Sequence, residues 1–168
     1  VKRGDQIIFA VNPEGNDSYD GGKLSVRISP KMAESSTANL EEDFGEQGSN
    51  GWYYGTCEWD GKNFELLEYD TENQRYDNDG KPELKKDFVE PGNGVNAAYQ
   101  WVAGEDGIIV IEGEYTKYTN IADVDANGVC LRIVQNRIGE RRKGEGMKKG
   151  GLIEEVTVNV NITLIYLL

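Results

Sequence analysis

A strict alternation of apolar and polar residues near the C-terminal end constrains the fold more than any other feature of the chain. Over nine positions, apolar side chains take turns with polar ones: Val156, Thr157, Val158, Asn159, Val160, Asn161, Ile162, Thr163 and Leu164. Successive side chains of a strand point to opposite faces, so this segment has one apolar and one polar face. The pattern predicts a half-buried strand of an antiparallel sheet.

Shorter segments of the same kind recur between turn residues. Glycine, which favours turns, accounts for 21 of the 168 residues, and Asp60–Asn63 predicts a hairpin. Residues 29–43 lack strand periodicity and are interpreted as a linker, while residues 95–102 have a helical alternative of a turn or two. A chain of this length forms one domain, so we expect an all-β fold over residues 1–168, an antiparallel β-sandwich or jelly roll. Its further candidate strands span residues 6–11, 23–28, 52–59, 64–69, 107–115 and 129–134.

Charge and composition exclude several classes of function. The 18 basic and 30 acidic residues give a formal net charge of -12, which argues against nucleic acid as a partner, because phosphate contacts need clustered cations. Histidine is absent, so catalysis by Ser-His-Asp or Cys-His groups is excluded. No apolar stretch approaches the roughly 20 residues of a membrane helix, so we expect no membrane insertion. The chain has no nucleophile motif or phosphate loop, and we expect no enzymatic activity.

The sequence does not determine whether the two cysteines form a disulfide or remain free thiols. Cys57 and Cys130 would form one disulfide in a secreted protein, and two buried thiols fit the sequence equally well. The chain opens at Val1 without a charged-then-apolar leader, so we interpret it as a mature product or an excised fragment.

Aromatic residues beside turns are the candidates for sugar binding. An exposed ring offers a flat apolar face to the C–H groups of a pyranose, while neighbouring Asp, Asn or Arg side chains hydrogen-bond the hydroxyls. Core packing is the alternative for each ring, and it is the interpretation that we prefer for Trp52 and Trp101. The candidates for carbohydrate binding are Trp59, Tyr69, Tyr76, Tyr115 and Tyr118.

An oxygen-rich turn is the candidate metal site. Asn16, Asp17 and Asp20 offer the carboxylate and amide oxygens that a structural Ca²⁺ prefers, and an ordinary turn is the alternative. The segment Asp123–Gly128 imitates the start of an EF-hand loop, but the twelfth position is Val134 instead of a bidentate carboxylate, so the EF-hand interpretation fails.

Four blocks of sequence resemble a known type of module. The segment Phe44–Gly55, with the hairpin residues Glu58–Gly61 after it, resembles the opening of a bacterial extracellular β-sandwich module that is appended to secreted carbohydrate-active enzymes and surface proteins. Residues 91–103, 106–113 and 127–133 resemble the blocks that follow, in the expected order. The resemblance implies a non-catalytic, lectin-like module at the bacterial cell surface or outside the cell, with a polysaccharide or glycan as partner.

The order of the segments departs from that module. Residues 1–9 resemble its end, which normally follows a strand like Val156–Leu164. The chain therefore looks circularly permuted, cut out of frame from a tandem array, or built for exchange of a segment between neighbours. We therefore expect residues 1–28 to pair with the C-terminal strand 156–164. If the pairing is with a neighbouring copy, the alternative function is a structural subunit of a surface assembly that associates with itself through terminal strands.

Overall fold

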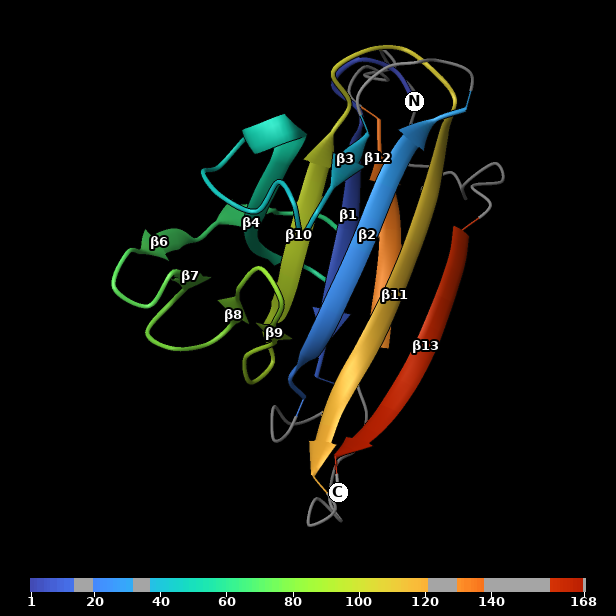
Figure 1. Cartoon of the computed structure of the whole chain (residues 1–168). Helices are drawn as coiled ribbons and strands as arrows, with labels where there is room; N and C mark the ends of the chain where they lie inside the picture. Colours follow the sequence, from blue (N-terminus) through green and yellow to red (C-terminus); the bar gives the residue numbers. More distant parts are fainter. Residues whose placement is uncertain (14–19, 32–36, 121–129, 138–157, 168) are drawn as a thin grey trace, which may run out of the picture.

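The computed structural model of the chain describes residues 1–13, 20–31, 37–120, 130–137 and 158–167 (Figure 1). These residues form two sheets that pack against each other, and their only helical element is the 3-10 turn η1 (Ser49–Gly51). The prediction of an all-β sandwich is confirmed.

The first sheet has five strands in the order β12-β1-β10-β4-β5, and every neighbouring pair is antiparallel. β1 is hydrogen-bonded along its length on both sides, to β12 and to β10. The strands of this sheet are β1 (Gln6–Asn12), β4 (Trp52–Cys57), β5 (Glu65–Leu66), β10 (Asn96–Val102) and β12 (Cys130–Asn136).

The second sheet follows the order β13-β11-β2-β9-β8-β7-β6, and β3 pairs with β2 beside this path. Its pairs are antiparallel except for β11 and β13, which run parallel. The strands are β2 (Gly22–Pro30), β3 (Ala38–Asn39), β6 (Glu68–Asp70), β7 (Arg75–Asp77), β8 (Glu83–Leu84), β9 (Val89–Glu90), β11 (Ile109–Asn120) and β13 (Val158–Leu167).

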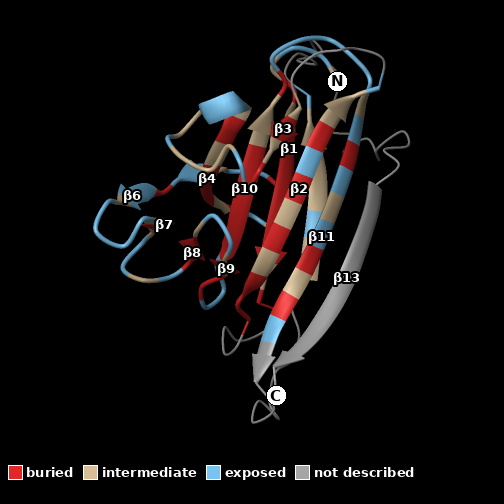
Figure 2. Cartoon of the chain, viewed as in Figure 1, coloured by how far each residue is buried: buried red, intermediate tan, exposed pale blue. Residues whose placement is uncertain are grey.

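The main core lies between the sheets, and along β2 buried residues alternate with less buried ones (Figure 2). Trp52 has 0% of its surface exposed, and its ring centre lies 6.0 Å from that of Phe9, so the core position predicted for Trp52 is confirmed. Burying one large apolar side chain contributes about 1.5–3 kcal/mol, so this layer holds the sheets together. β1 and β2 supply alternating members of the cluster: Ile7, Phe9, Val11, Leu24, Val26 and Ile28.

A second, smaller apolar cluster covers the outer face of the five-stranded sheet. Ile8 and Ala10 of β1 are fully buried there beside Ala98 and Cys57. The loop between β4 and β5 supplies Trp59 and Phe64 as part of the cover, together with Val134 of β12. β1 is therefore buried on both faces, which explains why its sequence is a continuous apolar run and not an alternating one.

The expected pairing of the two ends of the chain is wrong. β1 lies between β12 and β10, and β2 pairs with β11, β9 and β3. β13 instead runs parallel to β11, from Ile111 opposite Val158 to Asn120 opposite Leu167. Alternation specifies which face of a strand is buried but leaves its neighbours undetermined, and β12 occupies the place beside β1 that had been expected for the last strand.

Two local predictions are also corrected. Residues 95–102 have no helical turn, because Asn96–Val102 pairs on both sides as β10. The predicted linker 29–43 contains the last residues of β2 and the short strand β3, while residues 32–36 lie outside the described part.

The two cysteines lie in one row across the five-stranded sheet. Cys57 is opposite Asn96, and Cys130 is opposite Asn12, which neighbours Asn96 across the β1–β10 pair. Three inter-strand spacings of about 4.8 Å separate the cysteines, roughly 14 Å, which is beyond the reach of a disulfide. They are thus not bonded to each other, and burial raises the pKa of the Cys57 thiol to about 11 from an ordinary 9.0.

We predict that Cys57 resists alkylation in the folded protein. The raised pKa lowers its thiolate fraction at pH 8 roughly 100-fold, and burial restricts access further. Iodoacetamide labelling of a Cys130→Ser variant, followed by mass spectrometry, should give at least a 100-fold slower reaction in buffer than in urea. Equal rates in both solvents would show that Cys57 is not shielded.

Candidate functional site

An open groove of about 690 Å³ beside the β6–β7 hairpin contains one of the predicted sugar-binding residues, Tyr69. We call it the Tyr69 groove. Five acidic side chains and a single lysine are among the residues that line it, so its surface is strongly acidic. The lining residues are Thr56, Glu65, Leu66, Leu67, Glu68, Tyr69, Asp70, Asp77, Asn78, Asp79, Lys81, Pro82 and Val95.

The Tyr69 ring is exposed but rests on a fixed aromatic base. Tyr69 stands opposite Tyr76 in the β6–β7 pair, and Tyr76 stands opposite Leu84 of β8, so the three side chains share one face of the sheet. Leu84 and Tyr76 are buried in the core, whereas Tyr69, at the end of the row, is 44% exposed. The centres of the Tyr69 and Tyr76 rings lie 4.9 Å apart.

Tyr76 is itself held from several sides. Its ring stacks on that of Tyr54 at 4.5 Å, and its hydroxyl donates a hydrogen bond of 2.6 Å to the carbonyl of Gly45. Burial raises the pKa of Tyr76 above its ordinary value. The base on which Tyr69 rests therefore has little freedom to move.

The opposite face of the hairpin carries a row of carboxylates. Glu68, Asp77, Glu83 and Glu90 stand opposite one another across β6 to β9. Like charges at directly opposed positions destabilise a sheet, so this row needs cations. Lys81 pairs with Glu90 at 2.9 Å.

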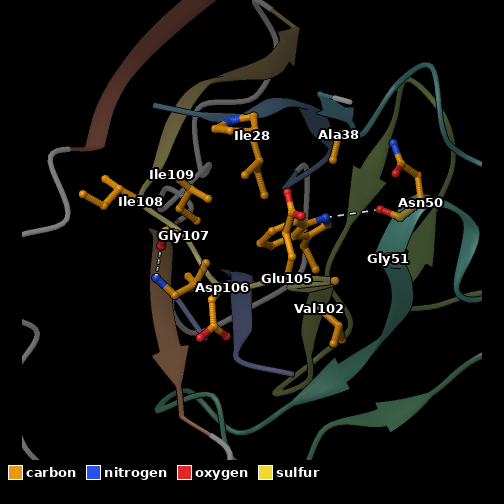
Figure 3. A pocket seen from close by; sticks show the side chains of 14 residues that line it. Ile28, Ala38, Asn50, Gly51, Val102, Glu105, Asp106, Gly107, Ile108 and Ile109 are labelled. Atoms are coloured by element: carbon orange, nitrogen blue, oxygen red, sulfur yellow. Dashed lines mark hydrogen bonds between the residues drawn. The ribbon is translucent and has the colours of Figure 1, made fainter. Parts of the chain in front are cut away.

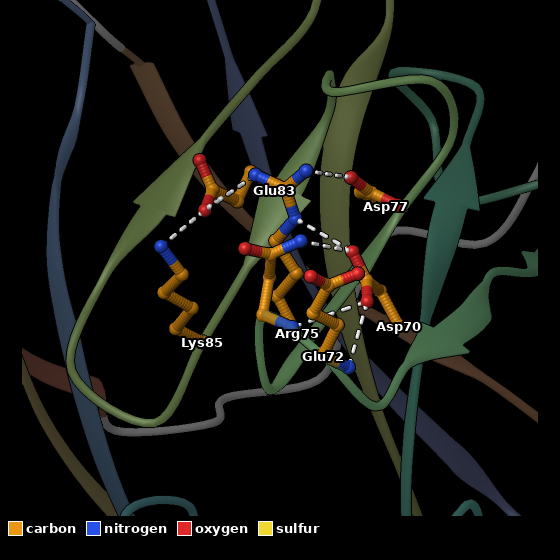
Figure 4. A network of polar contacts seen from close by, with 7 residues as sticks. Asp70, Glu72, Arg75, Asp77, Glu83 and Lys85 are labelled. Carbon is orange, nitrogen blue, oxygen red and sulfur yellow. Dashed lines mark hydrogen bonds and ion pairs between the residues drawn. The ribbon is translucent and has the colours of Figure 1, made fainter.

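Arg75 is the central cation of the row (Figure 4). Its guanidinium lies 2.8 Å from Asp77, 3.2 Å from Glu83 and 3.6 Å from Asp70. Lys85 approaches Glu83 from the other side at 2.5 Å. Arg75 thus offsets the charges of Asp77 and Glu83 in the row, and it also orients Asp70 and Asp77, two of the acidic residues of the Tyr69 groove.

Asp70 fixes the turn of the same hairpin. One carboxylate oxygen accepts the backbone N–H groups of Glu72 and Asn73, at 2.9 and 3.1 Å, and the other accepts the Asn73 amide at 2.7 Å. These hydrogen bonds, the Asn73 side chain first, lower the pKa of Asp70. The side chain therefore stays ionised at neutral pH, and the groove keeps its negative charge.

The other aromatic candidates lie apart from this groove. Tyr115, like Tyr76, is 2% exposed, so the expectation of an exposed ring is wrong for these two residues, and neither offers a face to a sugar. Tyr118 is 37% exposed, stacks on Phe88 and donates to the carbonyl of Asp87. Trp59 covers the second apolar cluster, and the Arg132 guanidinium lies over its ring at 4.7 Å.

The candidate calcium turn is described only at Asp20, because Asn16 and Asp17 lie outside the described residues. Asp20 is fully buried, and its Oδ1 lies 3.0 Å from the ammonium of Lys117, which is 4% exposed. That ammonium supplies at Asp20 the positive charge that a cation would bring. Within the described residues, no three acidic or cysteine side chains form a metal-binding group, and calcium at this turn stays a prediction.

A second, more apolar cleft of about 590 Å³ opens at one end of the sandwich (Figure 3). Ile28, Ile109 and the Trp101 indole line it, and Glu105 lies at the same cleft. The Trp101 Nε1 donates to the carbonyl of Asn50 at 3.2 Å, so the ring is held in place. Trp101 packs against the core as expected, although it is only partly buried.

Sequence reasoning found Tyr69 through its position next to a turn but missed the side chains around it. In the sequence, the polar stretch 70–75 stands out only as the neighbour of Tyr69 and Tyr76. The signal that could have revealed the charge row is the spacing of Arg75 and the nearby acidic residues. Residues i and i+2 share one face of a strand, so charged residues spaced by two predict a row of charges across neighbouring strands.

Comparisons with protein-family models, with curated proteins and with solved structures give no match to this chain. Among the residues described, no helix is long and apolar enough to cross a membrane. The function must therefore be argued from the geometry of the chain itself.

We predict that Arg75→Met destabilises the protein by roughly 2 kcal/mol, because it leaves the mostly buried carboxylates of Asp77 and Glu83 facing each other without their shared cation. Urea unfolding followed by circular dichroism measures the loss. Lys62→Met is the matched control, since Lys62 pairs with Asp60 on the surface, where both side chains are largely exposed, and should cost less than about 1 kcal/mol. Equal losses in the two variants would contradict the role of Arg75.

Proposed function

We propose that the protein is a non-catalytic carbohydrate-binding module of β-sandwich architecture that works outside the cell or at its surface. The observation that carries the proposal is the exposed Tyr69 ring, braced by Tyr76 at the wall of an open polar groove. Rigid aromatic platforms next to hydrogen-bonding groups suit a pyranose, whose ring has apolar C–H faces and a rim of hydroxyls.

The chemistry of the groove narrows the class of sugar. Asp77 and Asp79 offer acceptors to sugar hydroxyls, and the amide of Asn78 offers both a donor and an acceptor. Because carboxylates outnumber cations in the lining, the groove repels uronic acids and sulfated sugars. It therefore suits neutral or amino sugars. An open groove with one ring gives weak binding per module, which repetition of modules raises.

Affinity gel electrophoresis tests this function. Neutral polysaccharides, among them cellulose derivatives, glucans and mannans, should retard the protein, and Tyr69→Ala should weaken binding about tenfold, equivalent to about 1.4 kcal/mol for the lost stacking. Tyr118→Ala is the matched control, because Tyr118 is exposed to a similar degree outside the groove. The proposal fails if no polysaccharide retards the wild type with or without calcium, or if both variants lose binding equally.

A specific observation favours a second candidate function, a structural subunit that associates by strand exchange. Among the described strands, β13 is at the edge of its sheet and forms its ladder with β11 alone. The chain between Asn136 and Val158 has 21 residues, which span up to about 70 Å when extended. That length allows the last strand of one copy to reach β11 of another.

If the last strand is exchanged between copies, we predict disulfide links between two chains at an engineered cysteine pair. Thr116 stands opposite Thr163 in the β11–β13 register, so cysteines at both positions, in a chain with Cys57 and Cys130 replaced by serine, should form a disulfide. Non-reducing electrophoresis separates a link within one chain from a link between two, and light scattering of the intact protein gives its mass. A monomer with the link inside each chain would eliminate strand exchange.

A further inference from the structure

A polar hollow of about 530 Å³ lies on the outer face of the five-stranded sheet. We call it the amide pocket. Unlike the Tyr69 groove, it is lined mostly by uncharged hydrogen-bonding side chains, with a single charged residue, Lys62, among its described lining. The residues that matter for its chemistry are Gln6, Tyr53, Asn63, Phe64, Gln100 and Asn136.

The register of the sheet brings four of these side chains together from four strands, and the β4–β5 loop supplies Asn63 and Phe64. Gln100 of β10 stands between Ile8 of β1 and Tyr53 of β4. One row away, Gln6 of β1 stands opposite Asn136 of β12. Ile8 belongs to the outer cluster, so Gln6 and Gln100, which share its face, point outward as well.

Gln100 is the unusual member of the set. It is 7% exposed, and its Oε1 is buried without a hydrogen-bond partner. An unsatisfied buried amide oxygen is unfavourable, and the neighbours of Gln100 on this face, Ile8 and Ala98, show that an apolar residue would fit the surroundings. Rotation about the terminal torsion of glutamine is soft, so the amide can turn toward a ligand at little cost.

The walls of the pocket are fixed before any ligand arrives. Asn136 donates to the carbonyl of Gly61 at 3.0 Å, and Asn63 donates to Glu58 at 2.6 Å, so the β4–β5 loop is tied to β12 and to itself. Gly55 lets the Phe64 ring lie on the sheet, since a Cβ there would come within 2.8 Å of that ring. A rigid wall lowers the entropy lost on binding.

Leu66 connects the two hollows. This side chain is 57% exposed and lines both the amide pocket and the Tyr69 groove. A ligand long enough to cross Leu66 therefore contacts both sites, whereas a single sugar unit occupies one.

We propose that the amide pocket is a second subsite for an uncharged sugar unit, so that the ligand is a neutral oligosaccharide running from the Tyr69 groove over Leu66 to Gln100. This inference extends the proposed function and rests on it. Sugar hydroxyls both donate and accept, as the amides of Gln6 and Gln100 do, and the Phe64 ring offers an apolar wall. The scarcity of charge in the pocket selects against ionic ligands.

Nuclear magnetic resonance of ¹⁵N-labelled protein tests the subsite, because the side-chain amides of Gln and Asn give their own signals. The probes are cellohexaose, maltohexaose and mannohexaose, with glucose as the single unit. We expect one hexaose to shift the Gln100 and Asn136 amide signals saturably and to bind at least tenfold more tightly than glucose.

Gln100→Leu should weaken hexaose binding about tenfold and raise the urea midpoint, because it removes the unsatisfied amide. Gln6→Ala, at a partly exposed position, tests the pocket independently if Gln100→Leu fails to fold.

The possible outcomes distinguish a failure of the second subsite from a failure of the proposed carbohydrate-binding function. If a hexaose shifts signals around Tyr69 while the Gln100 amide stays still, and Gln6→Ala binds like the wild type, the subsite is overturned and the carbohydrate function stands. If the Gln100 amide shifts and Tyr69→Ala binds like the wild type, the Tyr69 groove is overturned. No shift with any probe overturns both. Gln74→Asn, an exposed amide outside both hollows, is the control and should bind normally.

Discussion

Burial of β1 on both of its faces is the constraint on which the rest of the molecule depends. Toward the second sheet it places Phe9 against Trp52 in the main core, and toward the outside it places Ile8 and Ala10 under the β4–β5 loop. Hydrogen bonds to β10 and β12 on its two sides set the register of the sheet. Because Gln6 continues the outward face just beyond Ile8, the strand that holds the sandwich together also carries one wall of the amide pocket.

The sequence contained enough to predict most of the longer strands, but not the short strands β3, β7, β8 and β9 or the neighbours of each strand. Alternation and turn residues located β1, β2, β4, β11, β12 and β13 to within a few residues, since period-two patterning follows directly from the pleat. The parallel pairing of β13 with β11 could not be predicted, because an amphipathic strand can bury its apolar face beside any partner. Residues 95–102 were ambiguous because Ala-Ala-Tyr-Gln fits a buried strand and a short helix equally well.

The candidate sites were predictable to different degrees. Nearness to a turn identified Tyr69 but also Tyr76 and Tyr115, which are buried, because this criterion does not tell which face of the strand a ring occupies. Only the cross-strand row shows that Tyr69 is the exposed end of a buried series. Gln100 and Asn136 are 36 positions apart and meet only through β1 between them. The available signal was the amide of Gln100 in the middle of β10, whose other residues after Asn96 are apolar or aromatic.

The distribution of charge then connects the two hollows to a common ligand. The chain has a net charge of -12, and Arg75 together with the turn at Asp70 holds Asp70 and Asp77 of the Tyr69 groove in place, so an acidic ligand meets negative charge there. The amide pocket adds almost no charge of either sign but adds donors and acceptors. Both hollows share the Leu66 side chain, so a ligand that spans them must be uncharged at one end and tolerant of carboxylates at the other. A neutral, hydroxyl-rich chain with apolar C–H faces satisfies both conditions, whereas an anionic polymer satisfies neither.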